Sequence, residues 1–377
     1  MLGLLTEQGP FQPNAFGGLD RNPHAWTKLA SMVFIEQPVG VGFSQTRHPL
    51  TETYGDLNAA KDNYQFVVNF FKRFPELQTN EFYISSESYG GHYLPTLAQQ
   101  LVVRGGVPNF KGLLVGNPLI TGPLRDYGEF MTLHGHDLIP QPLFDAFHLA
   151  KCKQDISSPT CRGLIAQSRA IVRDLDPYAL DFPKCPHGQL EKLALLSKLG
   201  VVEVEDQDEE GSVITATSRR RRQLQLEGGR VNKYVPCSET FAKRYLNRLD
   251  VQHQLHVAGV FKPWSGCNNY INLAYNRTDV EESMIPVYEF LMERKGIKVW
   301  IYSGDDDSVC PTSGDQEWIW KYPVTSKWTS WKVDGQVAGF VVKFKGMQYY
   351  TVHGAGHMVP STRPKQALEL LKKFLRA

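Results

Sequence analysis

The chain has 377 residues, of which 42% are apolar and 21% are charged, and its formal net charge is +2. These values are ordinary for a globular protein, and the length fits one large domain or two. So small a net charge gives no electrostatic footprint for a nucleic-acid partner, and no run reaches the roughly 20 apolar residues that a membrane span needs. The start of the chain, Met1 to Leu5, has no basic leader and is too short for a secretory signal peptide.

Short apolar runs alternate with helical patterns along the chain. Apolar residues at helical spacing extend from Leu57 to Phe71 and stop before Pro75, and a second such stripe covers Ala367 to Phe374. The short apolar runs are typical of buried parallel strands. They are Met32–Ile35, Phe82–Ser85, Gly112–Val115, Val299–Tyr302 and Tyr349–Val352. Strands that alternate with helices predict an α/β fold with a mostly parallel central sheet flanked by helices.

The strand pattern is interrupted in the middle of the chain, which predicts two parts. We expect a core made of residues 1–121 and 279–377, with residues 122–278 inserted as a helical and irregular cap over the carboxyl edge of the sheet. Within the cap, residues 203–230 combine an acidic run, a basic run and low apolar content, as a mobile surface loop does. The basic run, Arg219–Arg222, fits either a solvated charge cluster or a processing site for a trypsin-like or furin-like protease.

Five of the six cysteines lie in the predicted cap, and the first four of them, Cys152, Cys161, Cys185 and Cys237, allow three pairings. We favour a short Cys152–Cys161 loop and a Cys185–Cys237 staple that would hold two chains together after cleavage between them. No Cys-x-x-Cys pair occurs, so the cysteines do not indicate a zinc site. A single sequon at Asn276 would accept a glycan if the protein is secreted.

Three short motifs carry candidate chemistry, in the order serine, acid, histidine. They are Ser86–Gly91, Gly304–Pro311 and Gly354–Pro360. This is the triad order of α/β-hydrolases, whose catalytic groups follow strand ends. Ser88 is the candidate nucleophile, because it lies between a strand and a helix with the small Gly90 two positions later, although Ser86 stands where glycine is usual. His357 is the candidate base, and three adjacent aspartates, Asp305 to Asp307, compete for the acid that orients it.

These motifs resemble those of the serine carboxypeptidase family, which includes yeast carboxypeptidase Y, the wheat enzyme and lysosomal cathepsin A. The second aspartate of the family's Gly-Asp-x-Asp loop maps to Asp307. The resemblance therefore implies an α/β-hydrolase fold, a triad of Ser88, Asp307 and His357, and an oxyanion hole that uses the Tyr89 N–H. Further matches span most of the chain outside residues 122–265. They are Leu5–Pro10, Glu36–Ser44 and Gly116–Pro118.

The resemblance also implies a function: a serine-type carboxypeptidase that releases single C-terminal residues from peptides or proteins, at acidic pH and without a cofactor or metal. In the family, a protonated glutamate that matches Glu87 binds the substrate carboxylate and pairs with one that matches Glu7, and two carboxyls that share a proton have a raised apparent pKa. Met358 matches a pocket residue for the leaving amino acid, and Cys310 matches a thiol near the site. The implied location is a lysosome, a vacuole or the cell exterior, and a homodimer stays open.

The resemblance further predicts that the chain is truncated at its N-terminus. The family segment Gly-Gly-Pro-Gly-Cys-Ser-Ser should precede the match to Leu5–Pro10 and has no counterpart here. We therefore expect the first strands and one oxyanion glycine to be missing, Cys267 to lack its half-cystine partner, and Cys310 to be a free thiol as well. Two other functions stay open: an acyltransferase of the same fold, and a catalytically impaired protein that acts by association.

Overall fold

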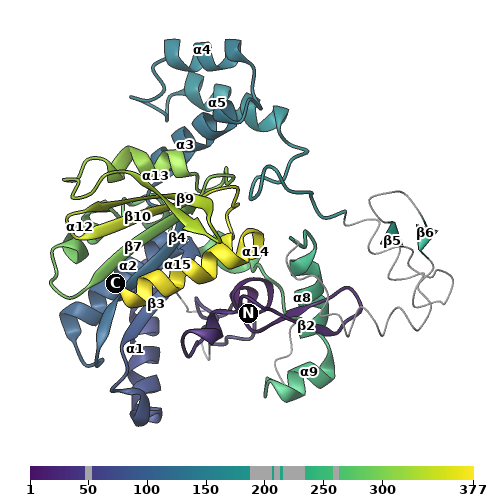
Figure 1. The fold of residues 1–377 in the computed structure, drawn as a ribbon, viewed down its shortest axis with the longest axis vertical. Helices are drawn as coiled ribbons and strands as arrows, with labels where there is room; N and C mark the ends of the chain where they lie inside the picture. The colour runs from purple at the N-terminus through teal and green to yellow at the C-terminus, as the bar shows by residue number, and fades with distance from the viewer. Residues whose placement is uncertain (47–52, 187–205, 208–212, 215–233, 258–262) are drawn as a thin grey trace.

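A six-stranded sheet forms the centre of the computed structural model, which describes residues 1–46, 53–186, 206–207, 213–214, 234–257 and 263–377 (Figure 1). The first four strands in spatial order run parallel to one another. The fifth strand is antiparallel to both of its neighbours, the fourth and the sixth. The spatial order is β3 (Phe82–Ser88), β4 (Phe110–Pro118), β7 (Lys298–Gly304), β10 (Met347–Val352), β9 (Gln336–Phe344) and β8 (Thr329–Val333). The predicted fold class, a mostly parallel sheet flanked by helices, is confirmed.

The strands bury side chains on both faces, because helices cover the sheet on both sides. Along β4, Leu113 and Val115 pack into one apolar core while Leu114, which lies between them, packs into the other. The first core is covered by α1 (Asp56–Arg73), α2 (Gly90–Arg104), α12 (Ile285–Met292) and α13 (Thr312–Ile319). The second is covered by α15 (Pro364–Arg376), which crosses the sheet in Figure 1. Such continuous apolar strands are characteristic of a sheet covered on both faces.

The two predicted helices are confirmed, with one residue on the wrong face. All four apolar positions of the C-terminal stripe, Ala367, Leu370, Leu371 and Phe374, are buried in α15. In α1, Val67 and Phe71 are buried, whereas Leu57 is 62% exposed. Leu57 lies in the first turn of the helix and packs into none of the apolar cores of the described residues. The helix ends at Arg73, before the short η3 (Pro75–Leu77) that the proline begins.

One predicted strand is wrong. Residues Met32–Ile35 form no strand. Their burial does alternate as in a strand, since Val33 and Ile35 are exposed and their neighbours are half-buried. A strand needs a hydrogen-bonding neighbour, and β3, the outermost strand of the described sheet, pairs only with β4. The segment has the apolar composition of a strand, but among the described residues no neighbouring strand pairs with it.

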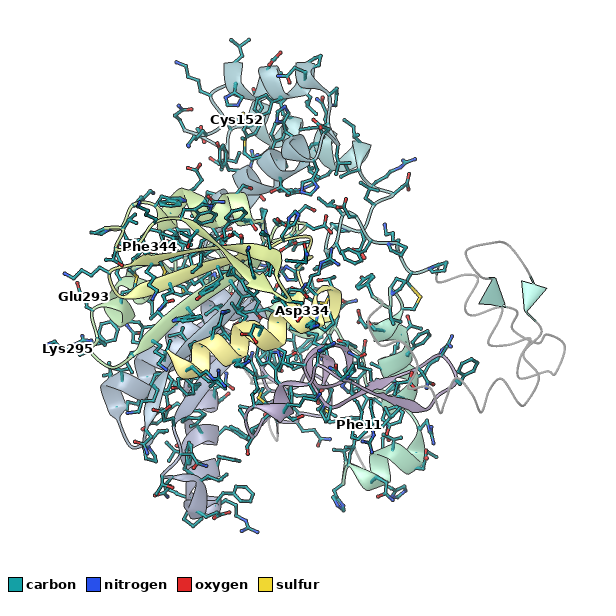
Figure 2. All side chains as sticks on the ribbon, viewed as in Figure 1. Phe11, Cys152, Glu293, Lys295, Asp334 and Phe344 are labelled. Atoms are coloured by element: carbon teal, nitrogen blue, oxygen red, sulfur yellow. A yellow bond between two sulfur atoms is a disulfide. The ribbon has the colours of Figure 1, made fainter. Side chains whose placement is uncertain are left out.

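The region between β4 and β7 contains two packed groups of helices. The first group, α3 (Gly122–Gly135), α4 (Gln141–Leu149) and α5 (Pro159–Ile171), has its own apolar core. The second group packs toward the N-terminal segment through a small core that includes Leu5 and Trp264. Its helices are α8 (Ser238–Leu246) and α9 (Leu249–Gln254), whereas the following α10 (Asn269–Ala274) and α11 (Arg277–Glu281) pack in a separate small core with Tyr54. In Figure 2, Phe344 lies at the sheet and Cys152 lies among the first helices, away from it.

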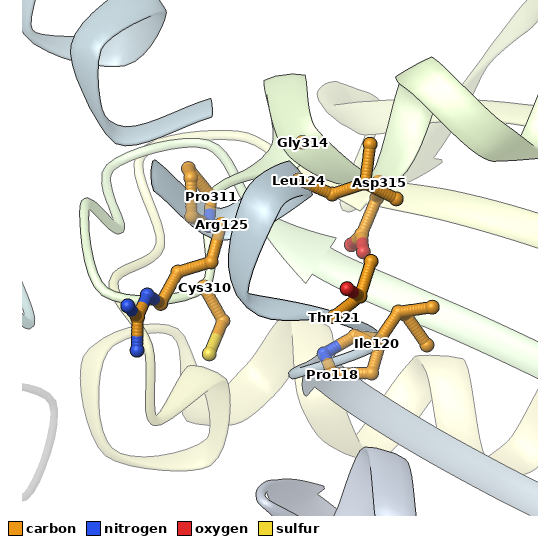
Figure 3. Close-up of a pocket in the computed structure, with 9 residues that line it drawn as sticks. All are labelled: Pro118, Ile120, Thr121, Leu124, Arg125, Cys310, Pro311, Gly314 and Asp315. Atoms are coloured by element: carbon orange, nitrogen blue, oxygen red, sulfur yellow. The ribbon is translucent and has the colours of Figure 1, made fainter. Parts of the chain in front are cut away.

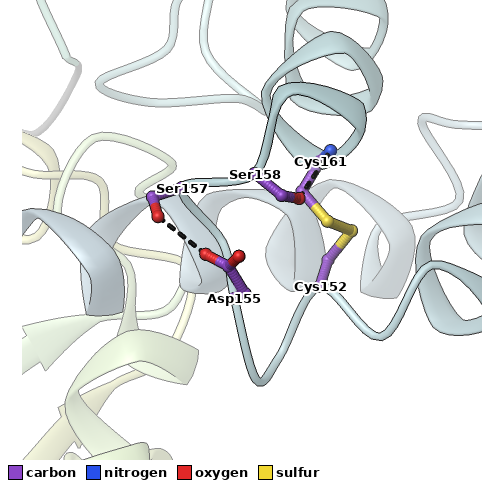
Figure 4. The surroundings of a disulfide bond; sticks show 5 residues. All are labelled: Cys152, Asp155, Ser157, Ser158 and Cys161. Carbon is purple, nitrogen blue, oxygen red and sulfur yellow. Dashed lines mark hydrogen bonds between the residues drawn. A yellow bond between two sulfur atoms is a disulfide. The ribbon is translucent and has the colours of Figure 1, made fainter.

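Both expected disulfides are present. The Cys152–Cys161 bond ties the end of α4 to the start of α5, where the Ser158 hydroxyl accepts a hydrogen bond from the Cys161 N–H (Figure 4). The Cys185–Cys237 bond spans 52 positions of sequence. The predicted loop 203–230 lies outside the described residues, except for the short antiparallel pair β5 (Asp206–Gln207) and β6 (Val213–Ile214).

The N-terminal segment lies against the carboxyl end of the sheet. It contains η1 (Gly3–Glu7), the β1 (Phe11–Pro13) and β2 (Leu19–Arg21) hairpin and η2 (Trp26–Lys28). The Ser361 hydroxyl of α14 (Val359–Thr362) donates a hydrogen bond to the Thr6 carbonyl, which brings η1 beside the segment that follows His357. Among the described helices, none has the length and apolar character to cross a membrane.

Candidate active site

Ser88 occupies a strained turn between β3 and α2. Its φ of 61° lies in the left-handed region, which residues other than glycine rarely adopt. The turn is tight, because a Cβ on Gly90 would lie 2.4 Å from the Ser86 hydroxyl oxygen. Glycine is therefore required at 90, and a serine is accommodated at 86 where glycine is usual. This geometry is that of a nucleophile elbow, which exposes the serine at the end of the strand.

Asp307 is the aspartate that faces His357. The Asp307 carboxylate is fully buried, and its Oδ2 lies 2.7 Å from the Nδ1 of His357. Oδ1 accepts the Val309 N–H at 2.7 Å, while Oδ2 also accepts the Cys310 N–H at 3.1 Å and the side-chain amide of Asn117 at 2.9 Å. Donors from this many sides fix the orientation of the buried carboxylate. It can hold an imidazole with its Nδ1 proton toward the acid and its Nε2 free to accept a proton.

The other two aspartates have different partners. Asp305 Oδ2 lies 2.8 Å from the Nδ1 of His353. Both oxygens of Asp306 accept the Asp181 N–H, and burial raises the pKa of Asp306 to about 6. Within the described residues, ligand atoms of His136, Asp181 and Asp306 lie within 4.8 Å of one another, a spacing that suits a metal. We assign no metal there, because the His136 Nε2 already contacts the Asp305 carbonyl oxygen at 3.1 Å.

Within the described residues, Ser88 and His357 form no hydrogen bond with each other. The Nε2 of His357 is buried without a hydrogen-bond partner, and the Ser88 hydroxyl instead lies in hydrogen-bond contact with the Cys310 thiol. Catalytic hydrogen bonds are often long before substrate binds. The Tyr178 ring packs edge-on against the imidazole at 5.2 Å, and the Tyr178 carbonyl accepts a hydrogen bond from the backbone N–H of His357 at 2.7 Å, which ties the two segments together.

Glu7 and Glu87 form a carboxyl pair beside Ser88. Their side chains hydrogen bond to each other, and η1 buries Glu7 almost completely. Burial raises the pKa of both groups, most strongly that of Glu87, which also lies near the charges of Glu7 and Asp307. Two buried carboxyls in contact cannot both be ionised at low cost, so the pair retains a proton well above the usual range of a glutamate.

Cys310 lines a small cavity beyond the acid loop (Figure 3). Burial is the main cause of the raised pKa of its thiol. The far wall carries Asp315, whose pKa burial also raises and whose Oδ2 is buried without a hydrogen-bond partner. Cys267 and Cys310 are the free cysteines, the first exposed and the second buried, in agreement with the expectation that neither is bridged.

The remaining predicted site residues lie at three different places. Tyr89 is the residue between β3 and α2, and within the described part of the chain its N–H donates no hydrogen bond. Met358 is half-buried and precedes α14, directly after His357. Asn276 is exposed at the start of α11, away from the carboxyl pair, where its side-chain oxygen caps the helix.

Two residues of the site were not predicted from the sequence. Asn117 is fully buried with a φ of 37°, and its side chain bridges Asp307 and the Gly304 N–H. Its motif, Gly116–Pro118, was noted as a match, and a polar residue directly after an apolar strand run was the available signal. Tyr178 carried no signal, because it reaches His357 from the inserted region across nearly 180 positions of sequence.

Known proteins resemble this chain along its whole length. The family model described as serine carboxypeptidase matches residues 1–377. Serine carboxypeptidase-like 26 and serine carboxypeptidase-like 34 of Arabidopsis thaliana are 35% and 32% identical to it over 99% of this chain, which spans 78% and 76% of their lengths. Serine carboxypeptidase 24 of the same plant is 32% identical, with 99% of this chain and 78% of the relative covered.

A solved structure shows the fold. The crystal structure of Kex1(delta)p, a prohormone-processing carboxypeptidase from Saccharomyces cerevisiae, superimposes with a TM-score of 0.69 at 21% identity. That match covers 100% of this chain and 80% of the yeast chain, and it shows an α/β-hydrolase fold. Together with the full-length family match and the plant relatives, it shows that the chain belongs to the serine carboxypeptidase family.

Proposed function

We propose that the chain is a serine-type carboxypeptidase that releases single C-terminal residues from peptides under acidic conditions. The observation that carries the proposal is the hydrogen-bonded Glu7–Glu87 pair beside Ser88. An exopeptidase must bind a free carboxylate next to its nucleophile, and an ionised glutamate there would repel it. A carboxyl that keeps its proton donates a hydrogen bond instead.

In the proposed reaction, Ser88 attacks the last peptide carbonyl while the Nε2 of His357 takes its proton. Asp307 orients the imidazole and stabilises the imidazolium. The Tyr89 N–H donates to the oxyanion of the tetrahedral intermediate. The peptide C–N bond then breaks, His357 gives its proton to the departing amino group, and the remaining peptide stays as an ester on Ser88. Water, deprotonated by His357, cleaves this ester and restores the serine.

We assign the substrate contacts as follows. Protonated Glu87, supported by Glu7, donates to the C-terminal carboxylate, and Met358 lines the pocket for the departing residue. Cys310, in contact with the Ser88 hydroxyl, lines the acyl side of the site. Residues 122–278 serve as the cap that contributes Tyr178 to this site. No step requires a cofactor.

The proposed setting is a vacuole, a lysosome or the cell exterior. Two disulfides support an oxidising compartment, and the exposed side chain of Asn276 suits a glycan acceptor there. A raised pKa at the carboxyl pair suits an acidic compartment as well, because acid keeps its proton in place.

The test uses an N-blocked dipeptide with a free C-terminus and its C-terminal amide, assayed between pH 4.5 and 7.5. We expect hydrolysis of the free acid in preference to the amide, a rate that falls toward neutral pH, and complete loss on Ser88→Ala or on labelling with a serine-directed phosphonate. Equal rates for acid and amide would contradict the carboxylate role. Transfer of an acyl group to an added alcohol without hydrolysis would identify an acyltransferase instead.

A further inference from the structure

Another buried carboxylate, outside the triad and the Glu7–Glu87 pair, contacts Tyr89, the residue after Ser88. Asp56, the first residue of α1, is 3% exposed. Its Oδ1 accepts the hydroxyls of Tyr89 at 3.0 Å and Tyr275 at 2.6 Å, and its Oδ2 lies 2.8 Å from the Nδ1 of His92. We call these four residues the Asp56 cluster. Three hydrogen-bond partners therefore satisfy the carboxylate.

The cluster holds the Tyr89 ring from three sides. Its hydroxyl is fixed by Asp56, its face stacks on His92 with centroids 4.6 Å apart and planes 13° apart, and the Tyr275 ring meets it edge-on at 5.8 Å. Burial, with the added charge of Asp56, raises the pKa of both tyrosines, so both hydroxyls stay protonated as donors. A tyrosine has two side-chain torsions, so a ring held in this way also restrains the backbone that carries it.

Each partner of the cluster comes from a different part of the chain. Tyr89 directly follows Ser88, while Asp56 begins α1 and Tyr275 lies in the inserted region. The Asp56 N–H also donates to the Asp279 carboxylate at 2.7 Å, which joins the starts of α1 and α11. The His92 ring hydrogen bonds to Asp56 through Nδ1, while its Nε2 is buried without a partner. The contacts therefore converge on Asp56, which holds the hydroxyl of Tyr89, the residue proposed above to donate its N–H to the oxyanion.

We propose that Asp56 is a positioning residue that aims the Tyr89 N–H at the oxyanion by holding the Tyr89 hydroxyl. The inference rests on the proposed function, because it assigns Ser88 as the nucleophile. Asp56 itself touches no reacting atom. Its effect should appear in the transition state, where the oxyanion forms, and not in the binding of substrate.

The central experiment compares Tyr89→Phe with the matched control Tyr64→Phe. Each change removes one tyrosine hydroxyl that links α1 to one end of α2. At the start of α2, the Tyr89 hydroxyl contacts Asp56, whereas the Tyr64 hydroxyl donates to the Gly105 carbonyl at 3.0 Å, just beyond the far end of α2. Loss of a whole oxyanion donor costs about 10²–10³-fold in kcat, so misalignment of the Tyr89 N–H should cost roughly 10-fold. We expect that fall in kcat for Tyr89→Phe, with KM within about two-fold, and no fall for Tyr64→Phe.

A second variant tests whether Asp56 acts through the hydroxyl. Asp56→Leu keeps the approximate size but accepts no hydrogen bond, and we expect its kcat to fall at least as far as that of Tyr89→Phe. If Asp56 acts on kcat through the Tyr89 hydroxyl, the double variant should have the kcat of Asp56→Leu alone, because the same contact is lost once. Asp56→Asn, which retains an acceptor oxygen for the tyrosines, should recover most of the kcat. The proposal would be overturned if the loss of kcat in the double variant equalled the product of the two single losses. It would also be overturned if Asp56→Asn recovered none of the lost kcat.

The rate of phosphonate labelling at Ser88 separates this inference from the proposed function. Labelling needs the serine, the base and the oxyanion hole, but it needs no recognition of a peptide carboxylate. If wild-type protein hydrolyses no peptide yet labels, and Tyr89→Phe slows labelling about 10-fold relative to Tyr64→Phe, the inference stands and the substrate assignment fails. Labelling rates that are equal in the two variants would overturn the role of the Asp56 cluster, whatever the peptide assays give.

Discussion

Replacing Glu87 by glutamine should remove most of the pH dependence that the carboxyl pair gives the protein. In the folded chain the pair keeps a proton because burial raises the pKa of both groups above the ordinary value of 4.5, and the contact with Glu7 raises the pKa of Glu87 further. The unfolded chain releases that proton as pH rises through 4.5. The folded state therefore binds more protons above this pH, and stability falls as pH rises until the folded pair ionises.

The magnitude follows from one proton. A difference of one bound proton changes the free energy of unfolding by about 1.4 kcal/mol per pH unit. Between pH 5.5 and 7.5, two pH units, wild type should lose up to about 2.7 kcal/mol through the pair. The Glu87→Gln variant has an uncharged donor in contact with Glu7, so Glu7 can ionise without a charged neighbour. Between pH 5.5 and 7.5, the free energy of unfolding of Glu87→Gln relative to wild type should therefore rise by the amount that wild type loses through the pair.

The assay is urea unfolding at half-unit steps from pH 4.5 to 7.5, with KM for a free-acid peptide measured over the same range. Wild-type KM should rise with pH as the pair loses its proton, while the KM of Glu87→Gln should stay nearly flat. Glu81→Gln, an exposed position just before the same strand, is the control and should follow wild type. A stability difference between Glu87→Gln and wild type that is constant across pH would refute the shared proton.

Three further outcomes are expected. Asn117→Ala should lower kcat about 10-fold and the melting temperature by several degrees, because a buried hydrogen bond to the charged Asp307 contributes about 1.5–3 kcal/mol; unchanged kinetics would remove its orienting role. Thiol titration should find one reactive cysteine, Cys267, in the native protein and a second, Cys310, only after denaturation without reductant. Ser88→Gly should be more stable than Ser88→Ala by about 1 kcal/mol, since glycine relieves the left-handed backbone, and calorimetry that ranks them the other way would contradict the strained turn.

The parts of the site that the sequence predicts are those with local signatures. Ser88, Asp307 and His357 each follow a short apolar run, and in a parallel sheet the carboxyl ends of strands gather at one edge. The disulfide pairings were likewise predicted from short spacing and from what each loop encloses. The choice of Asp307 over Asp305 needed the family motif, because three adjacent aspartates are equivalent until the chain folds and gives each of them a different partner.

The rest depends on contacts that no local pattern encodes. The Met32–Ile35 segment has the composition of a strand, but a strand exists only where a neighbour completes its hydrogen bonds. β8 and β9 were missed because one face of that hairpin is exposed, as at Phe340, which weakens the apolar run. The Asp56 cluster joins positions more than 200 residues apart, so its meaning appears only when α1, α2 and the inserted region are seen together.

The Cys185–Cys237 bond has a consequence for how this chain can vary. Because the disulfide joins Cys185 and Cys237 covalently, the number of residues between them can change at little cost in the free energy of folding. The entropy cost of closing a chain segment rises only slowly with its length, by about 0.6 kcal/mol for each doubling. Evolution can therefore lengthen, shorten or recode the intervening 51 positions without detaching the helices that follow. Sequence divergence within the family should concentrate there, while Cys185 and Cys237 are retained or lost together.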